Sequence, residues 1–149
     1  MEIKELTALS DDEMAQLVSA WESSVTATHH FLSAEELATI KQYVPQALRG
    51  VQHLVVAINA GQIKALMGID DTKLELLFVA ASERGKGMGS QLLKYGIAKY
   101  HVDELAVNEQ NPAARGFYEH LGFKVVDRSP LDDQGKPYPI LRMKRTPAE

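Results

Sequence analysis

Apolar residues recur at two different spacings along the chain, and these spacings predict the order of its helices and strands. From Ser10 to about Ser24 the apolar positions fall three and four residues apart, as they do on one face of a helix. A second helical stretch runs from Ser33 to about Val44, where Pro45 is expected to interrupt it. In both stretches a glutamate follows the first serine by three residues, the spacing of a capping box, which favours a helix start there.

The rest of the chain alternates short β-rich runs with two further helical stretches. Strands are expected at 1–6, 53–59, 63–69, 73–80, 102–107, 123–128 and 140–144, and helices at about 89–100 and 112–121. The last helix has a strong start signal in Asn111-Pro112 and a stop signal in Gly122. This order predicts an α/β fold with a mixed central sheet, in a single domain that spans residues 1–149.

Composition narrows the class of protein. The chain has 149 residues, of which 45% are hydrophobic and 24% charged, as in an ordinary globular domain. Its net charge of −4 does not suggest nucleic-acid binding, and neither a membrane span nor a signal peptide is apparent. We therefore expect a cytoplasmic protein, and its oligomeric state, monomer or homodimer, stays open. Without cysteine the chain has no thiolate nucleophile and no thiolate metal site, and no metal is predicted.

The stretch ERGKGMGSQLL, at 83–93, places three glycines and two cations at the entrance to a predicted helix. Glycine lets a ligand approach the backbone closely, and the first N–H groups of a helix are free to bind an anion, so a phosphate is the expected ligand. The spacing does not fit GxxxxGK followed by Ser or Thr, nor does it fit GxGxxG. The loop therefore belongs to neither common class of nucleotide site.

Arg84-x-x-Gly87-x-Gly89 resembles the coenzyme A motif of the GNAT-type N-acetyltransferase superfamily, and LAVNEQNPAARGFYEHLGF, at 105–123, resembles the second signature of that family. The predicted order of elements is also similar to that of the family. WESSVTATHHFL and RSPLDDQGKPYPIL resemble a subgroup of bacterial members. The resemblance implies a GNAT fold and transfer of acetyl from acetyl-CoA to a primary amine, on a small molecule or on a protein.

The resemblance also implies where coenzyme A would lie. Two splayed strands would hold pantetheine, with backbone groups of Phe78, Val79 and Ala81 as partners and the Val79 N–H directed at the thioester oxygen. Further cofactor contacts are expected from the loop and from the last helix: Arg84, Gly85, Lys86, Gly87, Met88, Gly89, Ser90, Asn111, Ala114, Phe117 and Tyr118. Two of these residues also have an alternative interpretation. Lys86 could be a solvent-exposed cation without a phosphate contact, and Asn111 could serve only as a helix cap.

Tyr118 occupies the place of the general acid of the family, which reprotonates the departing thiolate; the alternative is a core tyrosine bonded to a carbonyl. Glu75, four residues before Val79 and so expected on the same strand face, is one candidate base, although it also fits an exposed strand position. His29 and His30 are further candidates, as base or as substrate contacts.

Phe31 and Tyr138 are expected to wall the acceptor pocket. The absence of cysteine favours direct attack in a ternary complex. Two other classes stay open: a non-catalytic acyl-CoA-binding sensor, and a protein that binds ATP through the glycine loop.

Overall fold

The computed structural model describes residues 1–28, 32–132 and 134–146. The predicted order of helices and strands is confirmed. The elements are β1 (Glu2–Leu6), α1 (Asp11–Thr28), α2 (Ala34–Gly50), β2 (His53–Asn59), β3 (Gln62–Asp70), β4 (Lys73–Val79), the one-turn helix η1 (Ala81–Glu83), α3 (Met88–Tyr100), β5 (Glu104–Asn108), α4 (Pro112–His120), β6 (Phe123–Ser129) and β7 (Ile140–Arg145).

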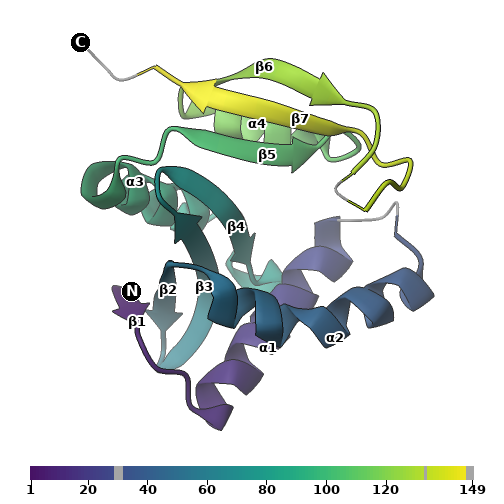
Figure 1. Cartoon of the computed structure of the whole chain (residues 1–149). Coiled ribbons are helices and arrows are strands. Elements are labelled where there is room, and N and C mark those ends of the chain that lie inside the picture. The colour runs from purple at the N-terminus through teal and green to yellow at the C-terminus, as the bar shows by residue number, and fades with distance from the viewer. Residues whose placement is uncertain (29–31, 133, 147–149) are drawn as a thin grey trace.

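One mixed sheet runs through the molecule in the order β1-β2-β3-β4-β5-β7-β6. Its neighbouring strands are antiparallel except β4 and β5, which run parallel. Helices α1 and α2 cover one face, whereas α3 and α4 lie on the other (Figure 1). Two hydrophobic cores result, one that contains Leu17 and Leu48 and one that contains Leu92 and Phe123. The predicted α/β fold with a mixed central sheet is thereby confirmed.

The two parallel strands at the centre of the sheet part soon after they meet. They pair through Lys73 with Glu104 and Leu74 with Leu105, and then diverge (Figure 1). Because β4 stays paired with β3 as far as Val79, it is the β5 side that opens. The carboxyl ends of β4 and β5 are therefore not paired with each other.

Two helix ends differ from the prediction. Helix α1 continues to Thr28 rather than about Ser24, and α2 runs through Pro45 to Gly50. Proline removes one backbone hydrogen bond from a helix. Here Val44 and Leu48, one turn apart on either side of Pro45, are both buried in the core against α1 and the sheet, and this burial outweighs the lost hydrogen bond.

The serine caps form as predicted and fix where the first two helices begin. Ser10 N–H donates to Glu13 Oε1 at 3.0 Å and Glu13 N–H to Ser10 Oγ at 3.1 Å. Ser33 and Glu36 make the same reciprocal pair at 3.0 and 3.1 Å. The start of α2 is thus set by its own sequence, next to the connection between α1 and α2.

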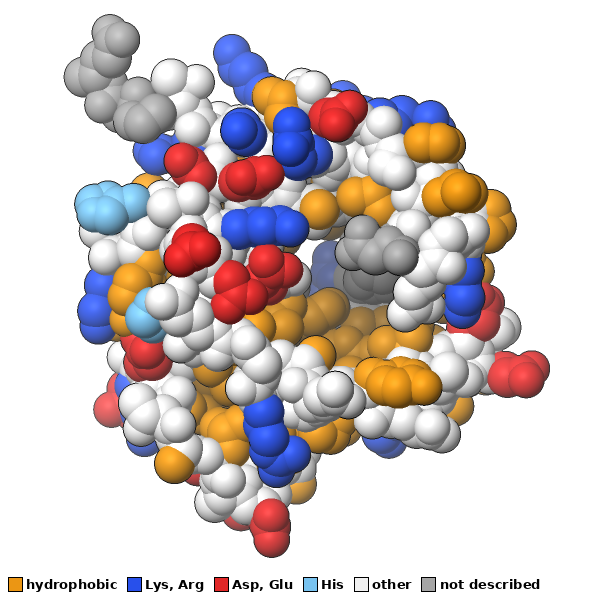
Figure 2. Space-filling view, viewed as in Figure 1, with side chains coloured by type: hydrophobic (Ala, Val, Ile, Leu, Met, Phe, Trp, Pro, Cys, Tyr) orange, Lys and Arg blue, Asp and Glu red, His pale blue; other side chains and the backbone are white. Residues whose placement is uncertain are grey.

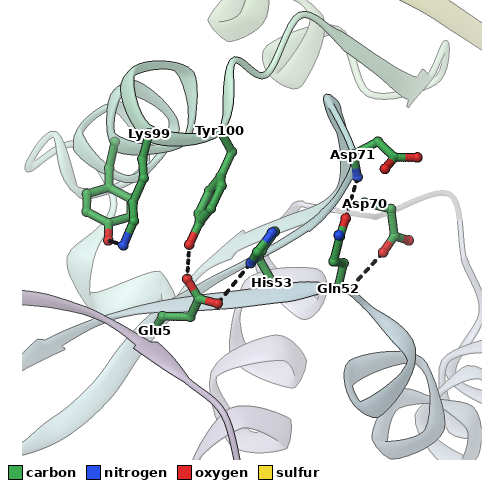
Figure 3. Close-up of polar contacts among 8 residues, drawn as sticks. Glu5, Gln52, His53, Asp70, Asp71, Lys99 and Tyr100 are labelled. Carbon is green, nitrogen blue, oxygen red and sulfur yellow. Dashed lines mark hydrogen bonds and ion pairs between the residues drawn. The ribbon is translucent and has the colours of Figure 1, made fainter.

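A polar cluster ties the edge strand β1 to the end of α3 (Figure 3). The carboxylate of Glu5 accepts hydrogen bonds from the Tyr100 hydroxyl and, at 2.9 Å, from His53 Nδ1. The rings of His53 and Tyr100 stack with centroids 3.9 Å apart. Burial acts to raise the pKa of Glu5, but the hydrogen bonds from Tyr100 and His53 outweigh it and lower that pKa. The cluster holds the far end of α3, whose near end begins at the glycine loop.

Candidate active site

A cavity of about 460 Å³ lies at the carboxyl end of β4, beyond the point where β4 stops pairing with β5. It is bounded by the end of β4, the glycine loop with the first turn of α3, and one side of α4. Its lining residues are Ser24, Leu77, Phe78, Val79, Glu83, Arg84, Gly85, Gly87, Met88, Gly89, Ser90, Asn111, Ala113, Ala114, Phe117, Tyr118, His120 and Leu121. Most of the residues predicted to contact the cofactor are therefore brought together in one place.

The glycine loop is built to bring backbone amides to the cavity. Gly85 and Gly87 have positive φ values of 79° and 80°, a conformation that other residues adopt only with strain, and Gly87 is the N-cap of α3. A Cβ atom on Gly89 would lie 3.2 Å from a Val79 methyl carbon and 3.6 Å from the Phe117 ring. Glycine at this position lets the first turn of α3 pack closely against Val79 and Phe117, which leaves the free N–H groups of the helix start beside the cavity.

The backbone of β4 presents alternate residues to the opening. Ala80 N–H donates to the Lys64 carbonyl of β3 at 2.8 Å, and Phe78 lies opposite Leu66 in the same register. Successive residues of a strand direct their backbone groups to opposite edges, so those of Val79 face β5 and the opening. The backbone role expected of Phe78 is wrong, because its backbone groups face β3; its side chain, however, lines the cavity.

Helix α4 closes the cavity from the other side. Asn111 is its N-cap and accepts a hydrogen bond from Ala114 N–H at 3.2 Å, and Pro112 occupies the first turn. The predicted helix start is confirmed, and Asn111 also lines the cavity, 9% exposed. A contact between Asn111 and pantetheine stays a prediction.

Tyr118 is the buried phenol of the cavity. Its ring packs edge-on against Phe117 and Phe123, with centroids 5.2 and 6.1 Å away, and the residue is 9% exposed. Its hydroxyl makes no hydrogen bond with any residue that the structure describes, so the alternative of a core tyrosine bonded to a carbonyl finds no partner there. Burial raises the pKa of Tyr118 well above its usual value, which keeps the hydroxyl protonated.

Charged side chains gather at the loop end of the cavity. Arg84 lines it, and no ion pair to Arg84 is found over the described residues. The Glu83 side chain also lines it, although it is only 8% exposed. Lys86, predicted to contact the cofactor, lies outside the lining, and its Nζ atom is 3.4 Å from Glu83 Oε2.

Two further predicted residues lie away from the cavity lining. Ala81 N–H donates to Ser23 Oγ at 2.9 Å, so that amide is already bonded within the fold. Glu75 is exposed and forms an ion pair with Lys73 at 3.8 Å. The expectation that Glu75 shares a strand face with Val79 fails because β4 bulges there: Gly68 pairs with Leu76, but Ile69 pairs with Leu74.

The acceptor side of the opening is less completely described. His29, His30 and Phe31 lie outside the described residues. The Tyr138 hydroxyl donates a hydrogen bond to Glu36 Oε2, which joins the loop between β6 and β7 to the first turn of α2. Figure 2, drawn from the side of α1 and α2, shows a hollow with hydrophobic side chains on its floor, next to a surface of mixed charge.

The sequence reasoning missed six lining residues, namely Ser24, Leu77, Glu83, Ala113, His120 and Leu121. Glu83 stands beside Arg84 in the motif, and Ala113 and Leu121 lie one helical turn or less from predicted contacts, so helical spacing offered a signal for these. Ser24 comes from α1, far away in sequence, and no local pattern indicated it.

A second depression, of about 340 Å³, lies between α1 and the start of β3 and holds none of the predicted site residues. Within residues 1–28, 32–132 and 134–146, no group of three acidic or histidine side chains is arranged to hold a metal ion. Over the same residues no helix is long and apolar enough to cross a membrane.

The profile of the acetyltransferase (GNAT) domain family matches residues 9–144. The chain is 37% identical over 132 residues to the peptidyl-lysine N-acetyltransferase YjaB of Escherichia coli K12, an alignment that covers 89% of this chain and 90% of that protein. Identity to the YjaB of Salmonella typhimurium is 35% over 132 residues, with 89% and 91% covered.

Solved structures of acetyltransferases are also similar to this chain. The solution structure of apo YjaB from Escherichia coli matches with a TM-score of 0.86 and covers 99% of this chain and 100% of that one. The PaiA N-acetyltransferase of Thermoplasma acidophilum, solved in complex with coenzyme A, shares the fold at 21% identity and a TM-score of 0.67, with 97% and 99% covered. The chain belongs to the GNAT acetyltransferase family, and its activity is that of an acyl-CoA-dependent N-acetyltransferase with acetyl-CoA as cosubstrate.

Proposed function

We propose that this protein acetylates the side-chain amine of lysine in a polypeptide, by direct attack of the amine on acetyl-CoA in a ternary complex. The observation that carries the proposal is the cavity at the carboxyl end of β4, which extends from the glycine loop to Tyr118. The choice of lysine as acceptor draws on the two bacterial relatives, both named peptidyl-lysine N-acetyltransferases.

The residues at the cavity fit coenzyme A. The amides at the start of α3 and the Arg84 guanidinium suit a diphosphate, and the close approach that Gly89 allows brings those amides next to Val79. The cavity is lined by apolar side chains such as Leu77 of β4 and Phe117 of α4, which suit a pantetheine arm. When bound, acetyl-CoA supplies the activated acetyl group.

Two groups of the chain act on the thioester in this proposal. The Val79 N–H, directed into the opening, donates to the thioester oxygen and stabilises the negative charge that develops there, an effect typically worth about 2.7–4 kcal/mol for one donor. The Tyr118 hydroxyl donates its proton to the departing sulfur. The amine nitrogen forms the new C–N bond as the C–S bond breaks, and it gives up one proton to a base.

The base stays a prediction. Glu75 is one candidate, because it stands at the residue where β4 and β5 stop pairing, and His29 and His30 are the others. The hollow of Figure 2 is where we propose that the acceptor enters. Tyr138, held by Glu36, and Phe31 are proposed as walls of that entrance.

The test is an assay of thiol release from acetyl-CoA with lysine-containing peptides, free lysine and small polyamines. We expect release with the peptides, and mass spectrometry should locate the acetyl group on the lysine side chain. Release with the small amines alone would refute the lysine proposal. Binding of coenzyme A without turnover on any amine would favour the alternative, a non-catalytic acyl-CoA sensor. A cytoplasmic location and a monomeric or homodimeric state remain predictions.

A further inference from the structure

Glu83 is an unexpected residue in a cavity that takes a diphosphate. Its side chain is 8% exposed and lines the cavity together with Arg84 and the glycine loop. A carboxylate next to a bound phosphate repels it, and the repulsion is stronger where water is largely excluded. The site therefore needs a way to neutralise this charge.

Lys86 is placed to do so. Its Nζ atom lies 3.4 Å from Glu83 Oε2, and its side chain is 64% exposed and does not line the cavity. Gly85, between the two, has a φ of 79° and turns the chain so that the ammonium group meets the carboxylate. No other ion pair to Glu83 is found over the described part of the chain.

We propose that Lys86 promotes coenzyme A binding through Glu83, by neutralising the buried carboxylate, and that it makes no contact with the diphosphate itself. Arg84 and the amides at the start of α3 then bind the diphosphate directly. Lys86 is therefore a positioning residue, because it acts on the diphosphate only through the charge of Glu83. The proposal rests on the use of acetyl-CoA by the protein.

The neutralising role and a direct phosphate contact make opposite predictions for one pair of variants. If Lys86 binds phosphate directly, its loss weakens binding whether or not Glu83 is charged. If Lys86 only neutralises Glu83, its loss matters when Glu83 is a carboxylate and ceases to matter when Glu83 is a neutral glutamine. A double-mutant cycle separates the two roles.

The experiment measures the affinity of coenzyme A by isothermal calorimetry for Lys86→Met, Glu83→Gln and the double variant. We expect Lys86→Met to weaken binding by about tenfold, because it leaves a buried charge unpaired beside an anion. Glu83→Gln should bind at least as tightly as the wild type, and the double variant within about twofold of Glu83→Gln. Lys94→Met, which removes an exposed lysine of α3 outside the cavity, is the matched control and should bind as the wild type does.

A double variant as weak as Lys86→Met would overturn the proposal and assign Lys86 to the phosphate. Equal affinity in all three variants and the wild type would overturn it as well. If Lys86→Met does not fold while the double variant does, as circular dichroism would reveal, the charge of Glu83 is what needs Lys86, and the comparison of Glu83→Gln with the double variant still tests a direct phosphate contact. Failure of the wild type itself to bind coenzyme A would instead contradict the use of acetyl-CoA. That result differs from one in which the wild type binds and the double variant binds as weakly as Lys86→Met.

Discussion

Replacing Tyr118 with phenylalanine isolates the proton that the proposed mechanism needs. The ring contacts with Phe117 and Phe123 are preserved in this variant, and the hydroxyl gives up no hydrogen bond to any described residue. The free energy of unfolding should therefore change by no more than about 0.5 kcal/mol. The affinity for coenzyme A should stay within about twofold, because the hydroxyl is needed only as the sulfur leaves.

The expected loss of turnover follows from the leaving group. General acid catalysis is typically worth about 10²–10⁴-fold, but a thiol of pKa about 8.5 leaves as a fairly stable anion, which places Tyr118 at the lower end. We expect kcat to fall by about 10–100-fold, or about 1.4–2.7 kcal/mol of transition-state stabilisation. Since burial raises the pKa of Tyr118, the wild type should show no alkaline loss of turnover from this group below about pH 10.

The assay is thiol release at saturating acetyl-CoA and saturating amine, with thermal unfolding as the stability control. Tyr43→Phe, which alters a tyrosine that is 60% exposed on α2, serves as the matched variant and should turn over as the wild type does. Wild-type kcat in Tyr118→Phe would remove Tyr118 as the general acid. A parallel loss of coenzyme A affinity would mean that the hydroxyl binds the ligand.

Three further predictions concern other parts of the molecule. Gly89→Val, whose first added carbon already lies 3.2 Å from Val79, should weaken coenzyme A binding by about tenfold or more in calorimetry, and unchanged affinity would contradict the position assigned to the diphosphate. Glu5→Gln should destabilise the fold by about 1 kcal/mol at neutral pH. Because Tyr100 and the neighbouring imidazole lower the pKa of Glu5 despite its burial, this stabilisation is present above the unfolded pKa near 4.3 and lost as the pH falls, so that the melting temperatures of variant and wild type should converge below about pH 3. Glu75→Gln tests the one candidate base that the structure describes: if Glu75 is the base, kcat/KM for the amine falls by about tenfold or more, and an unchanged kcat/KM excludes Glu75.

The glycine loop and the caps could be predicted because their geometry is decided within a few residues. Gly87 and Gly89 stand where a positive φ and a close approach require them, and Asn111 caps the helix that its own sequence begins. The course of the strands was predictable for a similar reason, since alternation of apolar residues reports burial directly.

Features that depend on contacts between distant segments were predicted wrongly or missed. The face of Glu75 was misjudged because the bulge in β4 is set by pairing with β3 across Gly68, and no local pattern near Glu75 records it. Helix α2 passes Pro45 because Val44 is buried in the core by elements elsewhere in the chain. Lys86 has a partner only because the loop folds back onto Glu83.

The short pairing of β4 with β5 has a consequence for how the molecule holds together. Two residue pairs join the halves of the sheet, so the free enzyme has a narrow seam along its middle. In the proposed complex the pantetheine arm would lie in that seam, and its amides would hydrogen-bond to the edge of β4 in place of a neighbouring strand. Hydrogen exchange at the Leu77 and Val79 amides should accordingly be fast in the free protein and slow in the complex with acetyl-CoA. This result would show that the acyl donor stabilises the centre of the sheet during each turnover.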